Sequence, residues 1–365
     1  MKINLIDPSL TDKSGHPYDL NLRIADELLR HNHEVSIYSN NRFIDDRALN
    51  EKVKITPVFS LSPYQNLQED PYTGELDEFI KYSSVYSQEL QKIPNADLII
   101  VPTMFSFLLN AFALIKMKTS IAACIHFGPD FNNLNNGSLR WRLAFRNAKN
   151  TLHLNLGGLE KVNYEDYLPI TFNEKFNLFP LPYDGSCCVS QKSKIEVVGF
   201  FGHQRGEKGV GFFMPLINYL VSKNINIIFH DSSANIKINH PKVKYLNYVE
   251  NISSEIAKCD LIFLPYKREN YSHKGSGILY ESFATGVPVI VPSDTTLSEH
   301  VNLTGSGVTF SGHTIESMID AFEAAQISYP KLLKNAVKNS GTWGQRHGIK
   351  NFVKAIIEPN NFFDC

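Results

Sequence analysis

Residues 200–209 carry two cations that are suited to binding a diphosphate. The segment reads FFGHQRGEKG, so Arg205 and Lys208 lie three residues apart after an apolar run. A guanidinium can bind two phosphate oxygens at once, whereas an ammonium acts as a point charge. Gly202 stands between the apolar run and the cations, where a small residue allows a ligand to approach the backbone. The alternative interpretation is a solvated loop whose charges are incidental.

Residues 271–292 place a glycine-rich turn in front of a helix. The segment reads YSHKGSGILYESFATGVPVIVP, and its turn contains Lys274, Ser276 and Gly277. The free N–H groups at a helix start and the positive end of the helix dipole together form an anion site. Glu281 follows about one turn later, where its carboxylate could accept hydrogen bonds from two vicinal ribose hydroxyls. An exposed helix glutamate is the alternative for Glu281. The two segments together predict a nucleoside-diphosphate site.

Apolar runs and helical periodicity alternate along the whole chain. Strands are predicted at 3–6, 34–38, 53–58, 98–101, 121–125 and 152–154 in the first half, and at 197–201, 225–229, 261–265 and 287–291 in the second. A strand, helix and strand of this length form a parallel pair with a right-handed crossover. The predicted fold class is therefore α/β, with two doubly wound parallel sheets. Such sheets bind ligands at the carboxyl ends of their strands, which is where both segments fall.

The length of 365 residues favours two domains, and a proline-rich passage at 179–185 interrupts the periodicity between them. We predict an N-terminal domain over residues 1–182 and a C-terminal domain over 183–342. The tail, 343–365, contains a further helical pattern, and we expect this helix to cross back to the N-terminal domain.

Composition limits the class of partner. A net charge of -1 gives no general attraction to nucleic acid, so an anion site must be built locally. Five cysteines show no metal-ligand spacing, and their odd number indicates free thiols in a reducing compartment, which points to the cytoplasm. The longest apolar stretch, 105–117, is too short to span a bilayer. No Asp-x-Asp motif stands beside the predicted site, so we expect neither a metal nor a tightly bound cofactor.

The two chemical segments resemble those of a known enzyme class. Residues 201–209 resemble the phosphate loop of retaining GT-B glycosyltransferases, and residues 277–292 are similar to their helix of the form Glu-Ala-x-Ala-x-Gly-x-Pro-Val-Ile. Glycosyltransferase family 4 is the closest comparison, and the resemblance spans both predicted domains. It implies a GT-B fold, in which two Rossmann-like domains face each other across a cleft. It also implies a nucleotide-sugar donor, a hydroxyl acceptor on a glycan or lipid-linked saccharide, and retaining, metal-independent transfer.

The resemblance assigns roles to individual residues. Arg205 and Lys208 would hold the diphosphate beside Gly202, and Ser276 and Gly277 would offer backbone N–H groups to it. Glu281 would bind the ribose. In the first half, His126 follows the predicted strand 121–125 and would reach the donor sugar, which makes His126, Arg205 and Lys208 the catalytic set. A buried histidine with ordinary partners is the alternative for His126.

Acceptor-side residues are also implied. The loop at Gly15 and His16 resembles the acceptor-side loop after the first strand, with Asp19 shortly beyond it. Asp130 would serve as a base if the reaction inverted, although an aspartate that caps a turn is the alternative. Residues 140–146, with Arg140, Arg142 and Arg146, form a cationic amphipathic stretch that would contact a membrane carrying a lipid-linked acceptor, or else an ordinary surface helix.

The sequence departs from the family pattern at one informative place. Family members often carry a second glutamate eight positions before the ribose-binding one, and this chain has His273 there, next to Lys274. Lys274 would add a cation near the phosphates and shift this turn towards charge neutralisation. Two other functions stay open: a GT-B epimerase or phosphorylase, and a non-catalytic module that binds nucleotide or carbohydrate. Surface-polysaccharide biosynthesis is the setting that analogy suggests.

Overall fold

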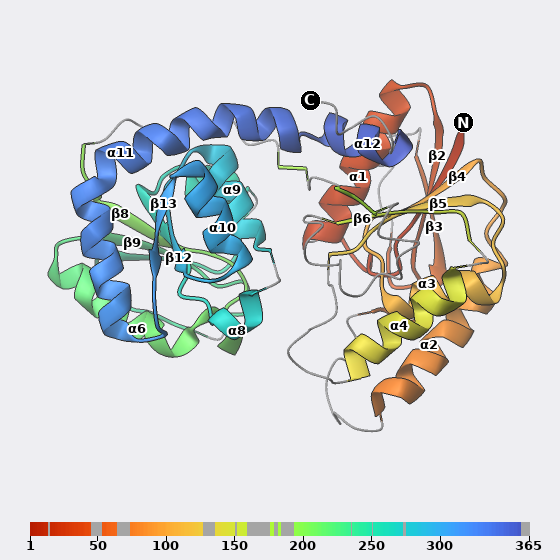
Figure 1. The fold of residues 1–365 in the computed structure, drawn as a ribbon, viewed down its shortest axis with the longest axis horizontal. Coiled ribbons are helices and arrows are strands. Elements are labelled where there is room, and N and C mark those ends of the chain that lie inside the picture. The colour runs from red at the N-terminus through yellow and green to blue at the C-terminus, as the bar shows by residue number, and fades with distance from the viewer. Residues whose placement is uncertain are drawn as a thin grey trace. The chain divides into compact units, whose positions relative to one another are not determined.

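A computed structural model of the protein describes residues 1–13, 15–44, 53–63, 74–126, 136–149, 152–158, 176–178, 182–183, 193–234, 236–249, 251–272 and 275–358 (Figure 1). The chain divides into two compact units. Unit 1 comprises Met1–Pro182 together with Ile349–Cys365, and unit 2 comprises Tyr183–Gly348. The chain therefore passes between the units twice, at 182/183 and at 348/349.

Unit 1 contains a seven-stranded parallel sheet in the order β3-β2-β1-β4-β5-β6-β7. Its strands are β1 (Lys2–Ile6), β2 (Glu34–Asn40), β3 (Lys54–Phe59), β4 (Leu98–Val101), β5 (Ser120–Cys124), β6 (Leu154–Gly158) and β7 (Phe176–Leu178). The register pairs Ile3 with Val35 on one side and with Leu98 on the other. The strand order reverses between β1 and β4, which is the doubly wound arrangement that the sequence predicts.

Helices cover both faces of this sheet. They are α1 (Gly15–Arg30), α2 (Gly74–Leu90), α3 (Ser106–Leu114), α4 (Asn136–Ala148) and α12 (Ile349–Ile357). Helices α1 and α12 share one core with Ile100, whereas α2, α3 and α4 share the other with Ile99 and Val101 (Figure 1). Successive residues of a strand point to opposite faces, so an unbroken apolar strand such as β4 serves two cores.

Unit 2 contains a six-stranded parallel sheet in the order β10-β9-β8-β11-β12-β13. Its strands are β8 (Val197–Phe200), β9 (Asn226–His230), β10 (Val243–Leu246), β11 (Leu261–Phe263), β12 (Val289–Pro292) and β13 (Gly307–Phe310). Both sheets therefore have the Rossmann order, which confirms the predicted fold class of two doubly wound α/β domains.

The helical elements of unit 2 are η2 (Gly206–Lys208), α6 (Val210–Ser222), α7 (Ile252–Ile256), α8 (Arg268–Tyr271), α9 (Gly277–Thr285), α10 (Thr296–Thr304) and α11 (Ile315–His347). Helices α6 and α11 share the main core with β8, β9 and β11. Helix α7 packs against α9. Because α9 joins the end of β11 to β12, its first turn lies at the carboxyl edge of the sheet.

The predicted crossing helix requires a correction. Trp343 lies in α11 of unit 2, and the part of the tail that belongs to unit 1 begins at Ile349. Trp343 is buried in unit 2, where its ring stacks on His347 at 3.7 Å and on Tyr280 at 5.5 Å between centroids. Helix α11 ends at His347, and the extended backbone of Gly348 separates it from α12.

Candidate functional site

The phosphate-loop segment begins where β8 ends, at the carboxyl edge of the unit 2 sheet. Gly202 has φ +123°, a conformation that side chains rarely adopt. A Cβ atom built at Gly202 would lie 2.6 Å from Nζ of Lys208. The ammonium group therefore lies directly against the backbone of this glycine. The small residue expected to let a ligand approach the backbone here admits a cation of the same loop.

A tight turn brings Lys208 back over the strand end. The Lys208 amide donates to the Arg205 carbonyl at 2.9 Å, and the short helix η2 occupies the turn. Gly209 follows with φ +76°, and a Cβ at Gly209 would lie only 1.9 Å from the carbonyl oxygen of Pro265. The amide of Lys267 donates to the Glu207 carbonyl at 2.9 Å. The loops that follow β8 and β11 are therefore in direct backbone contact.

Two stacked aromatic rings lie beside Lys208. Nζ of Lys208 is 5.4 Å from the ring centroid of Tyr266, a cation–π geometry. Tyr266 in turn stacks on Tyr271, with 4.4 Å between centroids. Burial raises the pKa of Tyr271, helped by Tyr266 and Glu207, while the positive charge of Arg205 acts in the opposite direction. Arg205 and Lys208 thus both act on the same buried tyrosine pair.

The loop after β8 is anchored to the end of β9 by a buried carboxylate. Asp231 accepts hydrogen bonds from the amides of Gln204 at 3.1 Å, Ser233 at 3.0 Å and Ile236 at 3.1 Å. Its burial alone would raise the pKa, but the hydrogen bonds from Ser233, Gln204 and Ile236 outweigh burial and hold the pKa of Asp231 below its ordinary value. Asp231 therefore stays ionised and fixes the course of the loop.

Two histidines beside the cations favour the neutral form. Burial lowers the pKa of His203, and the nearby charge of Arg205 lowers it further. Burial also lowers the pKa of His230, with Asp231 opposing and Lys208 reinforcing the shift. The Gly202 amide lies 3.3 Å from Nδ1 of His230 and donates to it, which requires that ring nitrogen to be unprotonated. At neutral pH the positive charge of this loop therefore comes from Arg205 and Lys208.

The start of α9 adjoins the same loop. A Cβ at Gly202 would lie 3.8 Å from Cγ1 of Ile278, in the first turn of α9. Ser276 is the N-cap, and its hydroxyl accepts a hydrogen bond from the Leu279 amide at 3.5 Å. The hydroxyl of Tyr183 lies 3.1 Å from a Cβ built at Gly277. Of the predicted site residues, Gly202, Lys208 and the turn at Ser276 and Gly277 are thus brought together. Tyr183 was missed because it is remote in sequence.

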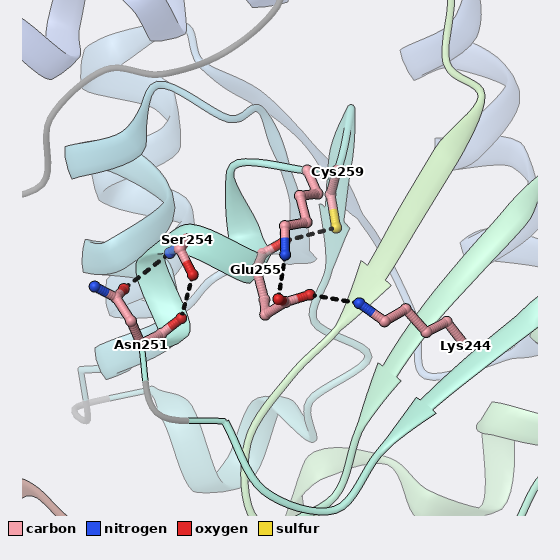
Figure 2. Close-up of polar contacts among 6 residues, drawn as sticks. Lys244, Asn251, Ser254, Glu255 and Cys259 are labelled. Carbon is pink, nitrogen blue, oxygen red and sulfur yellow. Dashed lines mark hydrogen bonds and ion pairs between the residues drawn. The ribbon is translucent and has the colours of Figure 1, made fainter.

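Glu281 lies one turn further along α9 and faces α7. Its Oε2 accepts a hydrogen bond from the hydroxyl of Ser253. Helix α7 is held in place at both ends, since Asn251 caps its start and Glu255 pairs with Lys244 of β10 at 3.0 Å (Figure 2). Glu281 is only partly exposed, which does not fit the alternative interpretation as an exposed helix glutamate.

The residues predicted in unit 1 are held by local partners. His126 follows β5, and its Nε2 donates to the Pro102 carbonyl at 2.8 Å, while Sγ of Cys124 lies 3.7 Å from Nδ1. Because a carbonyl oxygen only accepts, Nε2 of His126 carries a proton. Asp19 is 63% exposed in its side chain and pairs with Arg23 at 3.3 Å. Gly15 and His16 begin α1. Asp130, His273 and Lys274 lie outside the described residues.

One buried carboxylate in unit 1 was not predicted. Asp7 follows β1 and is fully buried, and it accepts hydrogen bonds from Ser9 at 2.5 Å and from Asn21 at 2.6 Å. Burial raises the pKa of Asp7, and the hydrogen bonds from Ser9 and Asn21 only partly oppose this. The sequence could have indicated Asp7, because this residue directly follows the first predicted strand.

The cationic stretch at 140–146 forms most of α4. Trp141 and Phe145 are buried in the core of unit 1 and stack on each other at 5.3 Å, whereas Arg142 and Arg146 are exposed. Trp141 and Phe145 are thus used inside the protein, whereas Arg142 and Arg146 lie on the exposed side of α4 together with Leu139. Within the described residues, the structure contains no helix with the length and apolar character needed to cross a bilayer. The described residues also contain no group of three or more histidine, cysteine, aspartate or glutamate side chains that could hold a metal ion.

Comparison of sequences alone identifies no relative: no family model matches the chain, and no curated protein matches it significantly. Solved structures match nearly the whole chain. Sucrose-phosphate synthase from Thermosynechococcus elongatus has 10% identity and a TM-score of 0.69, with 98% of each chain covered. WaaG, a glycosyltransferase involved in lipopolysaccharide biosynthesis, has 13% identity and a TM-score of 0.65, with 98% of this chain and 100% of WaaG covered.

A third similar structure was solved with a nucleotide sugar. Anabaena HepE in complex with UDP-glucose has 15% identity and a TM-score of 0.65, with 98% of this chain and 99% of HepE covered. Likeness at these identities concerns the fold, and it confirms the predicted GT-B architecture. Membership of glycosyltransferase family 4 stays a prediction.

Proposed function

We propose that the protein is a glycosyltransferase that binds a nucleoside-diphosphate sugar in unit 2 and transfers the sugar to a hydroxyl acceptor. One observation carries the proposal. The ammonium of Lys208 lies against the backbone of Gly202, and Ile278 in the first turn of α9 adjoins the same glycine. Both groups lie at the edge of the sheet formed by the carboxyl ends of its strands. A cation beside the first turn of a helix at such an edge is suited to binding a pyrophosphate. Similar folds in glycosyltransferases, one of them solved with UDP-glucose, support the same function.

The chemistry proposed for this site is stabilisation of the leaving group. As the bond between sugar and diphosphate breaks, negative charge grows on the distal phosphate. Lys208 and Arg205 would neutralise that charge together with the N–H groups at Ser276 and Gly277, and Lys274 would add to them. Fixed dipoles and charges act more strongly where water is excluded. The uncharged histidines His203 and His230 leave the two cations as the charged partners of a diphosphate on this loop.

We also propose that the transferred sugar keeps its anomeric configuration and that transfer needs no metal ion. Both points rest on the resemblance to retaining GT-B enzymes. In unit 1, His126 would contact the donor sugar with the proton on Nε2 already engaged by Pro102. Gly15, His16, Asp19 and Asp130 would lie on the acceptor side. A glycan or a lipid-linked saccharide is the proposed acceptor class, in surface-polysaccharide biosynthesis.

A cytoplasmic location with peripheral membrane contact completes the proposed setting. Because Trp141 and Phe145 are buried, contact through α4 would be electrostatic, through the exposed Arg142 and Arg146. Sedimentation with vesicles that contain anionic lipid, at low and high salt, tests this. Salt-sensitive binding that is lost when both arginines are replaced by glutamate is expected. Binding that is unaffected by the replacement would contradict it.

The donor site is tested by nucleotide binding. UDP, GDP, ADP and dTDP are screened by thermal shift, since a ligand of the folded state raises the melting temperature. The best of them is then titrated calorimetrically into wild type, Lys208→Ala and Glu281→Ala. Each substitution removes a charge-assisted contact, so affinity should fall about tenfold or more. Lys242→Ala is the matched control, because Lys242 precedes β10 at the opposite edge of the sheet. Unchanged affinity in both site variants would overturn the proposal.

The reaction itself distinguishes the remaining functions. Incubation with the nucleotide sugar and an acceptor panel should release nucleoside diphosphate only when an acceptor is present. Isomerised donor without acceptor would identify an epimerase instead. Binding with no turnover across the whole panel would identify a non-catalytic module, for which His273 in place of the usual glutamate is the supporting feature.

A further inference from the structure

A hydroxyl group beside Glu281 has no role in the function proposed above. Ser253 lies in α7, 28 positions before Glu281, and its Oγ donates a hydrogen bond to the carboxylate Oε2. Both residues are partly buried. Helices α7 and α9 are neighbours in the packing of unit 2. The contact is therefore a tertiary one, which joins the only charged group of α9 to a helix from another part of the chain.

Helix α7 is short, and a network of its own fixes its position. The Asn251 side chain accepts a hydrogen bond from the Ser254 amide at 2.9 Å, and the Ser254 hydroxyl donates one to the Asn251 carbonyl at 2.8 Å (Figure 2). Glu255 accepts from Lys258 and, at 3.0 Å, from Lys244 of β10. The hydrogen bond from Lys258 is the main reason why the pKa of Glu255 lies below its ordinary value, with Lys244 adding to the effect.

The core side of α7 is anchored as well. Ile256 is fully buried, and Sγ of Cys259 donates to the Glu255 carbonyl at 3.7 Å. The hydroxyl of Ser253 is thus carried by a helix that is capped, paired to β10 and packed on the core. A donor fixed in this way can hold the carboxylate of a flexible glutamate in one orientation.

A carboxylate can accept about four hydrogen bonds, so Ser253 and a ligand can bind Glu281 at the same time. Two vicinal ribose hydroxyls need both carboxylate oxygens in a defined plane. A glutamate side chain that is ordered before the ligand arrives loses less conformational entropy on binding. The bond to Ser253 would supply that order.

We infer that Ser253 is a positioning residue for Glu281 and that it sets the preference of the site for ribose over 2′-deoxyribose. The inference rests on the proposed nucleotide site. Ser253 acts through Glu281 and not by touching the diphosphate. Its removal should therefore affect the recognition of the 2′-hydroxyl and leave the contacts of Lys208 in place.

The test compares UDP with 2′-deoxy-UDP by calorimetry on the full chain, or GDP with 2′-deoxy-GDP if the screen selects guanine. Wild type should prefer the ribonucleotide. Ser253→Ala should weaken UDP binding about threefold to tenfold, the usual effect of one lost hydrogen bond, and change 2′-deoxy-UDP binding little. The preference for UDP over 2′-deoxy-UDP then falls by the same factor.

Two further variants serve as controls. Ser253→Thr keeps the hydroxyl and should restore the preference for UDP. Ser254→Ala is the matched control, since among the described residues the Ser254 hydroxyl donates to the carbonyl of Asn251, the N-cap of α7, and this variant should leave the ratio unchanged.

Two results would overturn the inference. The first is a Ser253→Ala variant whose ratio of UDP affinity to 2′-deoxy-UDP affinity equals that of wild type. If both affinities fall equally and the melting temperature also falls, Ser253 is only a structural link between α7 and α9. The second is a wild type that binds UDP and 2′-deoxy-UDP equally. Failure of the proposed function is different from both, because wild type would then bind none of the nucleotides.

Discussion

Six strands of each sheet follow the same order, yet the carboxyl edges of the two sheets are chemically unlike. In unit 2 the edge presents Arg205 and Lys208 on a glycine loop beside the start of α9. In unit 1 the corresponding edge holds Asp7, which is fully buried, and His126, which is bonded to Pro102. The fold alone therefore does not distinguish the two edges. Our proposal places the diphosphate in unit 2 because of the side chains of its loops, as expected when function is added to a common architecture.

Buried aspartates show the difference most clearly. Asp7 and Asp231 each follow a strand, and each is fully buried. Asp231 is surrounded by enough hydrogen-bond donors to stay ionised, whereas burial raises the pKa of Asp7. The unit 2 carboxylate thus serves as an ionic anchor for a loop, whereas burial makes ionisation of the unit 1 carboxylate less favourable than in water.

Replacing Gly202 should have the largest effect on the proposed site. A Cβ at 2.6 Å from Nζ of Lys208, on a backbone with φ +123°, forces the ammonium or the loop to move. We expect Gly202→Ala to lose about 1–3 kcal/mol of unfolding free energy and to weaken nucleotide binding about tenfold. Urea unfolding and calorimetry measure the two quantities. Gly206→Ala is the control in the same loop, because nothing lies within 4 Å of its Cβ position. Equal behaviour of the two variants would refute the close approach of Lys208.

Tyr266 offers a smaller effect on the same cation. Loss of a cation–π contact costs about 0.5–2 kcal/mol, so Tyr266→Leu should weaken nucleotide binding about threefold to tenfold. Among the described residues, the Tyr266 hydroxyl is buried without a hydrogen-bond partner. Tyr266→Phe should therefore bind nucleotide as wild type does. Affinities are compared by calorimetry, and a Phe variant as weak as the Leu variant would show that the ring is not what holds Lys208.

The sequence predicted the central strands of both sheets, for a physical reason. Central strands are buried on both faces and read as unbroken apolar runs, as in Leu98–Val101. The edge strands β10 and β13 were not predicted, because they are only partly buried and alternate polar with apolar residues. Glu281 was found from its helix, but its partner Ser253 and the anchor Asp231 depend on packing between distant segments. The break at Gly348 was missed because helical periodicity continues on both sides of it.

The smallest expected effect is the opposite pH response of the two aspartates. A lowered pKa in the folded state means that Asp231 contributes stability above its unfolded pKa of about 3.9 and loses it as the pH falls through the folded value. The raised pKa of Asp7 has the reverse sign, so its contribution is full at low pH and declines as the pH rises through the folded value. Urea unfolding between pH 3 and 7 should therefore show the stability advantage of wild type over Asp231→Asn growing with pH. The stability advantage of wild type over Asp7→Asn should shrink as the pH rises. If the two variants show the same pH dependence of unfolding free energy, the proposed difference between Asp7 and Asp231 is wrong.

Hydrogen–deuterium exchange with and without the best-binding nucleoside diphosphate tests the central claim most directly. Our account predicts slower exchange at the amides of residues 202–209 and 275–281, with the α7 segment 251–254 following through Ser253. It predicts no protection by the nucleotide alone at residues 7–10 or at His126 in unit 1. Protection confined to unit 1, or exchange at the Gly202 loop and the start of α9 that the nucleotide leaves unchanged, would contradict a donor site in unit 2.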